Sequence, residues 1–138
     1  TAHRGLSQLG PASRRACLGS TLLANPVILE PILGIEVRVP QDLVGNVASV
    51  ISGKRGKVLD MQQKGIVSIV IGEVPASETF DLSQVMRGQT AGKAIWNTFF
   101  KSWSPIPKSL VGKLVPEIRK RKGLSPEPPK ANEFIDKE

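Results

Sequence analysis

Apolar and polar positions alternate clearly near residue 35, and beyond residue 40 their spacing changes. The alternating apolar positions, separated by glycine or charged residues, are Leu33, Ile35, Val37 and Val39. This period of two predicts a strand with one buried face. From residue 43 to residue 51 the apolar positions recur at helical spacing, after a Pro-Gln-Asp start and before Gly53, and they predict a helix.

A similar succession of patterns follows farther along the chain. The stretch "KRGKVLDMQ" indicates a turn and a second strand, and "IVSIVIGEV" is apolar enough to predict a central third strand. Asp81, with Gln84 three residues later, resembles a capping box that starts a second helix. Residues 94–103 predict a fourth strand.

This order predicts an α+β fold, the ferredoxin-like βαββαβ sandwich, over residues 33–103. Both crossovers are expected to be right-handed, which places both helices on one face of the sheet and leaves the other for a partner or another domain. Trp96 and Trp103 lie seven residues apart on the last strand, so alternation predicts opposite faces, with one ring in the core.

The two flanks predict simpler elements. Residues 1–10 are Gly-rich and polar and predict a loop, and Pro11 suits the first turn of a helix that reaches Leu23. Near the other end, "LVGKLVPEIRKRKGL" predicts a short basic helix that is interrupted or restarted at Pro116. The remainder is Pro-rich and charged and predicts an extended tail.

Composition adds a bias toward polyanions. The chain has 138 residues, and its 19 Lys and Arg against 12 Asp and Glu give a net charge of +7. This surplus favours nucleic acid or an anionic membrane surface as a partner. The longest strongly apolar run, "IVSIVIG", is much shorter than a membrane span, and the start lacks a signal-peptide layout. Neither a membrane span nor a secretion signal is therefore expected. We expect a cytoplasmic protein with no membrane among its partners.

The sequence contains few residues that could support catalysis or bind a metal ion. "GKRGK" does not fit a nucleotide P-loop, and no paired carboxylates stand out. The single Cys17 excludes an internal disulfide and a Cys-based zinc site, and it suits a reducing cytosol. The single His3, near the chain start, is poorly placed for a catalytic triad. We therefore expect no catalytic residue, no metal and no enzyme activity in this chain, which also begins without Met and is expected to be a fragment or a processed chain.

Two basic clusters are the candidate contacts for a nucleic acid. One is predicted at the turn between the first helix and the second strand, and the other lies near the C-terminus. Charge runs are most often solvated surface, but Lys and Arg also bind RNA phosphates. RNA contact is favoured for the first cluster, and both interpretations stay open for the second. The residues are Lys54, Arg55 and Lys57, and then Arg119, Lys120, Arg121 and Lys122.

At this point the motifs resemble a known family. "LEPILGIEVRVPQDLVGNVASVISGKRGKVL" and "SETFDLSQVMRGQTAGKAIWNTFF", with its Arg-x-x-Thr-x-Gly segment, resemble the last domain of translation elongation factors 2 and G. "IRKRKGL" with a Pro-rich tail resembles the archaeal and eukaryotic form, and "HRGLSQLGPASRRA" resembles the tip loop and following helix of the preceding domain. The resemblance covers essentially the whole chain.

The resemblance implies a division of the chain into three parts and a set of binding partners. Residues 1–28 would be the remnant of the tip domain, 29–107 the ferredoxin-like last domain, and 108–138 a basic helix and tail folding back on the tip domain. The parent factor would bind GTP and Mg²⁺ and drive ribosomal translocation, whereas this chain would hold no cofactor. Its partners would be ribosomal RNA, stalk-base proteins and the rest of the factor.

The resemblance also gives His3 a role. In the archaeal and eukaryotic family, the histidine of the His-Arg-Gly loop is converted to diphthamide, and His3 matches that position. This modification requires an exposed loop and diphthamide-modifying enzymes, and no catalytic partner within the chain.

Two other interpretations remain. One is a free-standing ferredoxin-like module that regulates or binds RNA, since this fold hosts many functions. The other is a fragment of a related ribosome-assembly or spliceosomal GTPase, against which the His-Arg-Gly tip argues.

Overall fold

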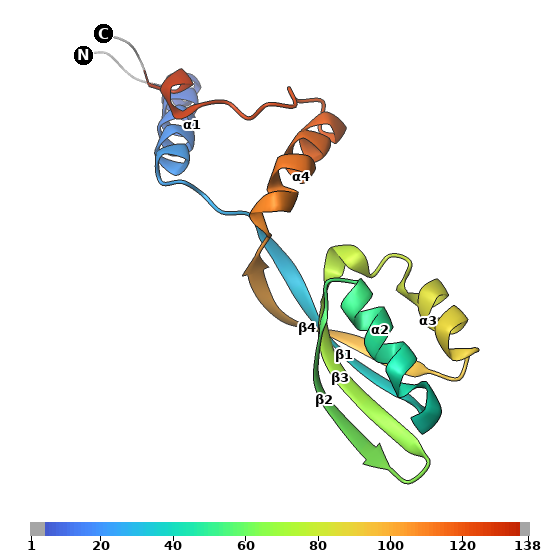
Figure 1. The fold of residues 1–138 in the computed structure, drawn as a ribbon. Helices are drawn as coiled ribbons and strands as arrows, with labels where there is room; N and C mark the ends of the chain where they lie inside the picture. Colours follow the sequence, from blue (N-terminus) through green and yellow to red (C-terminus); the bar gives the residue numbers. More distant parts are fainter. Residues whose placement is uncertain (1–4, 136–138) are drawn as a thin grey trace. The chain divides into compact units, whose positions relative to one another are not determined.

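The chain forms two compact units. A computed structural model describes residues 5–135 of the chain. The sheet unit is the continuous segment Leu29–Pro105, and the terminal unit combines the residues before Leu29 with those after Pro105. Figure 1 shows the elements of each unit.

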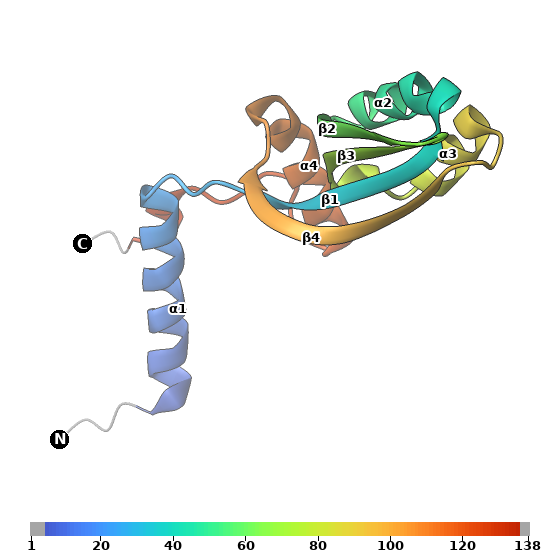
Figure 2. The same ribbon diagram turned by 90° about the horizontal axis from the view of Figure 1, so that it is seen from below.

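The sheet unit is a four-stranded sheet with two main helices. Its strands and helices are β1 (Leu29–Pro40), α2 (Val44–Gly53), β2 (Lys57–Lys64), β3 (Val67–Pro75), α3 (Leu82–Thr90) and β4 (Ile95–Pro105), with 3-10 turns η1 (Gln41–Leu43) and η2 (Ala76–Glu78). The strand order is β2-β3-β1-β4, with every neighbour antiparallel (Figure 2). The α+β ferredoxin-like prediction is confirmed, and β3 is central as expected.

The core lies between the sheet and the two helices. Alternation along β1 buries Ile35, Val37 and Val39 on the side of α2 and α3. The helical spacing of α2 and α3 supplies the facing side chains, which are Val47, Val50, Ile51, Leu82 and Met86. Burying one such side chain contributes about 1.5–3 kcal/mol, so this layer holds the unit together.

A bulge interrupts the pairing of β4 with β1. Ile32 pairs with Ser102 but Leu33 pairs with Phe100, so β4 carries one extra residue, Lys101. Simple alternation therefore does not hold along the whole strand, and seven residues do not fix opposite faces for the two tryptophans. Trp96, before the bulge, is half-buried against the core, as expected for one of them.

Beyond the bulge the other tryptophan is largely exposed. Trp103 keeps 61% of its surface open to solvent, and its ring lies 5.8 Å from the ring of Phe100. The end of β4 thus displays aromatic surface that the core does not use.

The terminal unit consists of α1 (Leu6–Leu23), α4 (Lys108–Arg121) and the 3-10 turn η3 (Ala131–Glu133). The loop expected over residues 1–10 is wrong for its second half, because α1 already begins at Leu6 and contains Pro11. The N–H groups of Gln8 and Leu9 bond the carbonyl of Gly5, which closes the first turn ahead of the proline. The terminal residues 1–4 lie outside the described part.

The break expected at Pro116 is also wrong, since α4 runs through it. Proline removes one backbone hydrogen bond, and the turns on either side maintain the helix here. No helix in residues 5–135 is long and apolar enough to cross a membrane.

The tail is not simply extended. Its η3 turn packs on α1, where a guanidinium nitrogen of Arg15 donates to the carbonyl oxygen of Glu133 at 3.2 Å. Gly19 of α1 is buried at this contact, and a Cβ placed on it would lie 3.3 Å from the Cβ of Phe134. Because residue 19 is glycine, the tail can approach α1 closely.

Candidate nucleic-acid interface

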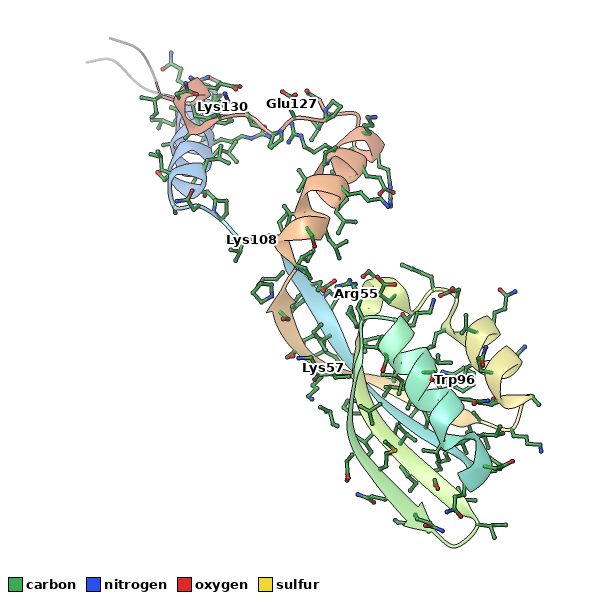
Figure 3. The ribbon with its side chains drawn as sticks, in the orientation of Figure 1. Arg55, Lys57, Trp96, Lys108, Glu127 and Lys130 are labelled. Carbon is green, nitrogen blue, oxygen red and sulfur yellow. The ribbon has the colours of Figure 1, made fainter. Side chains whose placement is uncertain are left out.

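The turn between α2 and β2 carries the first predicted basic cluster, and its central arginine is engaged inside the unit. Arg55 has a φ of 55°, which turns the chain out of α2. Its guanidinium donates to both carboxylate oxygens of Glu30 at 3.0 Å each, and to Oε1 of Glu78 at 2.9 Å. Figure 3 shows Arg55 beside η2, the turn that contains Glu78. The geometry is a bidentate pair extended by a second carboxylate.

This network is largely removed from solvent. Glu30 is 6% exposed, and the hydroxyl of Ser77 lies 3.4 Å from its Oε2. The hydrogen bonds to Glu30, and secondarily those to Glu78, raise the pKa of Arg55 above its usual value. Arg55 thus joins the start of β1 to η2 and to the α2–β2 turn, and its charge is already balanced by carboxylates.

Gly56 makes the turn tight. Its N–H donates to the carbonyl oxygen of Ile51 at 3.0 Å. A Cβ on Gly56 would lie 2.6 Å from the carbonyl oxygen of Glu73 and 2.7 Å from that of Ile51. Both are backbone atoms, so this position accepts no side chain without moving β3 or α2.

Lys54 is paired as well. Its Nζ lies 2.5 Å from Oδ1 of Asp81, and 17% of the lysine side chain is exposed. The hydrogen bond from Lys54 lowers the pKa of Asp81. The capping box expected at Asp81 and Gln84 is wrong: Asp81 is the N-cap residue but makes no capping hydrogen bond with its side chain. Its carboxylate contacts the lysine at the end of α2 instead.

The third residue of the cluster differs from the other two. Lys57 is exposed at the start of β2 (Figure 3), and its side chain has no ion pair with any described residue. Three further cations of the sheet unit share this state, and they lie outside the two basic clusters predicted from the sequence. They are Lys64, Arg87 and Lys93. A sequence signal existed for Arg87, because α3 contains no Asp or Glu.

The second basic cluster belongs to the terminal unit, at the end of α4. Arg119 donates to the carbonyl oxygen of Ser125 at 2.6 Å, and Arg121 pairs with Glu117, one turn earlier, at 2.6 Å. Lys120 and Lys122 are exposed and unpaired among residues 5–135. Cations at a helix C-terminus also stabilise the helix dipole, so part of this cluster has a local explanation.

His3 lies outside the described residues. Within residues 5–135 no group of three His, Cys, Asp or Glu side chains is arranged to hold a metal ion. The side chain of Cys17 is exposed and forms no disulfide with a described residue.

The chain is similar in sequence to a known protein family and to several known proteins. Residues 27–124 match the family described as Elongation factor G C-terminus. The chain is 67% identical over 137 residues to Elongation factor 2 of Cenarchaeum symbiosum (strain A), which is 99% of this chain and 19% of that protein. It is 51% identical over 136 residues to Elongation factor 2 of Korarchaeum cryptofilum (strain OPF8), covering 98% of this chain and 18% of that protein.

A solved structure shares the fold. A crystal structure from Thermus thermophilus superimposes on 70% of this chain and 14% of its own, with 32% sequence identity and a TM-score of 0.63. The chain spans about a fifth of the length of the curated relatives named above.

Proposed function

The chain belongs to the family of translation elongation factors that includes Elongation factor 2, and we propose that it is the ribosome-contacting part of a factor that promotes GTP-dependent translocation. The identity of 67% across nearly the whole chain is the observation that carries this proposal. GTP and Mg²⁺ would bind to parts of the factor outside this chain, and the chain itself would perform no catalysis. The factor would act in the cytoplasm.

Ribosomal RNA is the partner proposed for the exposed cations. A phosphate binds a lysine most readily where no carboxylate competes, which favours Lys57 within the first cluster. Lys54 and Arg55, each paired with a carboxylate, would hold the turn in shape. In the terminal unit, Lys120 and Lys122 meet the same condition, and stalk-base proteins would cover neighbouring surface.

His3 would be the substrate of diphthamide-modifying enzymes. The proposal is supported by the His-Arg-Gly sequence and by its position directly ahead of α1. The modification adds a fixed positive charge, which suits a tip that reaches into RNA.

The test uses a chimeric factor, in which this chain replaces the matching fifth of the Cenarchaeum symbiosum protein. Produced in an archaeal host, the chimeric factor is expected to support GTP-dependent translocation on archaeal ribosomes. Mass spectrometry of the peptide containing His3 is expected to show a diphthamide increment, which the variant His3→Gln lacks. An inactive chimeric factor that binds no ribosome, or an unmodified His3 in this host, would contradict the corresponding part of the proposal.

A further inference from the structure

The terminal unit contains a cavity that the proposed ribosome contact does not use. Its volume is about 810 Å³, which lies in the range of small-molecule sites. Its walls come from three segments that are far apart in the sequence, which are α1, the end of α4 with the residues that follow it, and the tail. The tail wall includes Pro128 and Pro129, whose fixed φ angles limit how far this wall can collapse.

Apolar side chains form most of the cavity surface. Leu18 and Leu22 contribute from α1, and Phe134 contributes from the tail. Leu18 keeps 39% of its surface open to solvent, so these side chains line a space that is accessible from outside. Apolar walls bind water poorly, and an apolar ligand gains about three- to fourfold in affinity for each CH₂ group that it buries.

The charged side chains that line the cavity are arginines. Arg14 and Arg15 lie on α1 and Arg119 lies near the end of α4, whereas no described Asp or Glu lines the cavity. Glu127, labelled in Figure 3, and Glu133 line a neighbouring cavity of about 310 Å³ instead. The charge of the larger cavity is therefore complementary to an anion.

Two of the three guanidiniums already have partners within the unit. Arg15 donates to the carbonyl oxygen of Glu133 at 3.2 Å, and Arg119 donates to that of Ser125 at 2.6 Å. Arg14 is exposed and makes no hydrogen bond or ion pair with a described residue. The cavity therefore offers one unpaired guanidinium, whose planar fork can bind a carboxylate or a phosphate through two hydrogen bonds.

We propose that this cavity binds a small amphipathic anion, with a carboxylate or phosphate on Arg14 and an apolar body against Leu18, Leu22 and Phe134. One unpaired cation matches a ligand with one anionic head. RNA carries a phosphate on every nucleotide and needs several cations along its path. A bilayer is too large to enter a cavity of this volume. The inference is independent of the ribosome contact and adds a ligand site to the terminal unit.

The experiment measures binding of fatty carboxylates to the 138-residue chain by isothermal titration calorimetry. Octanoate, decanoate and dodecanoate are expected to bind with affinities that rise about three- to fourfold for each added CH₂ group. Decanol and decyltrimethylammonium share the alkyl chain of decanoate but lack its anionic head. Both are expected to bind several-fold more weakly than decanoate, with the cation the weakest of the three.

Two variants separate the anionic contact from the apolar wall. Arg14→Gln is expected to weaken decanoate binding several-fold, to the level of decanol, and to keep the helical content of the parent because Arg14 is exposed. Leu22→Ala is expected to weaken decanoate and decanol alike. Arg87→Gln is the matched control, since it removes an exposed arginine of the sheet unit that has no partner among the described residues, and it is expected to leave the affinity unchanged.

Several outcomes would overturn the site. Equal decanoate affinities for the parent and for Arg14→Gln, or equal affinities of the parent for decanoate and decanol, would remove the anionic contact. Displacement of decanoate by oligouridine would assign the cavity to RNA, and binding to anionic vesicles that Arg14→Gln abolishes would assign it to a membrane.

The chimeric factor provides the last comparison and is expected to bind decanoate as the separate chain does. If only the separate chain binds it, the rest of the factor covers the cavity and the proposed site is wrong. None of these measurements depends on ribosomes, so the proposed function stands or fails separately, by the translocation experiment above.

Discussion

The sheet unit and the terminal unit use their apolar residues in opposite ways. The sheet unit buries its aliphatic side chains between the sheet and two helices, and several of them are fully inaccessible. In the terminal unit, the single buried residue among those described is Gly19. Leucines of α1 remain open to solvent, with Leu6 at 90% and Leu23 at 63% exposure.

The difference shows which unit carries its own stability. Isolated helices are marginal in water, so α1 and α4 require packing that local contacts with the tail supply in part. Apolar side chains left exposed along a helix mark a surface that another segment covers. The sheet unit needs no such cover for its core, so the α2–β2 turn stands on a rigid support.

The largest expected effect comes from truncating a core side chain of the sheet unit. The comparison is the same kind of truncation on α1 of the terminal unit. Met86→Ala opens the fully buried core and is expected to lower the free energy of unfolding by about 2–5 kcal/mol. Leu18→Ala, on α1 with 39% of its surface exposed, is expected to cost under about 1 kcal/mol. Urea denaturation followed by circular dichroism measures both, and equal losses would remove the distinction between the units.

A smaller effect is expected where a buried charge holds the sheet unit together. Glu30→Gln weakens the bidentate pair with Arg55, and a loss of about 1–3 kcal/mol is expected because the guanidinium keeps Glu78 as a partner. Glu36→Gln is the matched control, since its pair with Arg38 is exposed and is expected to contribute at most about 1 kcal/mol. Similar melting temperatures for the two variants would show that the network is not a stabilising element.

The smallest expected effect depends on pH. Since Lys54 lowers the pKa of Asp81 below its unfolded value of 3.8, the pair stabilises the fold above that value. The contribution is lost as the pH falls through the lower folded pKa. Melting temperatures of the parent and of Asp81→Asn are therefore expected to differ by a constant amount near neutrality and to converge in acid. A difference that grows in acid would reverse the assigned sign.

The order of strands and helices was predictable because it follows from local spacing. The alternation along β1 and the helical period of α2 are properties of neighbouring residues, and the packing of the two helices on one face follows from them. The family resemblance was also carried by contiguous motifs, and the comparisons confirm it.

The features that were missed depend on residues distant in sequence. Arg55 and Glu30 lie 25 positions apart in the sequence, and Lys54 and Asp81 lie 27 apart. The sequence of the turn alone therefore does not show that its cations pair with carboxylates of the same unit. The extra residue Lys101 in β4 is fixed by the pairing with β1 and has no signal in its own strand. At Pro116, neighbouring turns outweigh the local preference of one residue.

Gly56 limits which substitutions the α2–β2 turn can accept. A Cβ at this position would lie 2.6 Å and 2.7 Å from two main-chain oxygens, so the turn tolerates no bulkier residue there. Substitutions in this turn are therefore confined to exchanging side chains on a fixed backbone, at Lys57 and its exposed neighbours. The backbone of this turn therefore permits changes in surface charge but not in backbone shape.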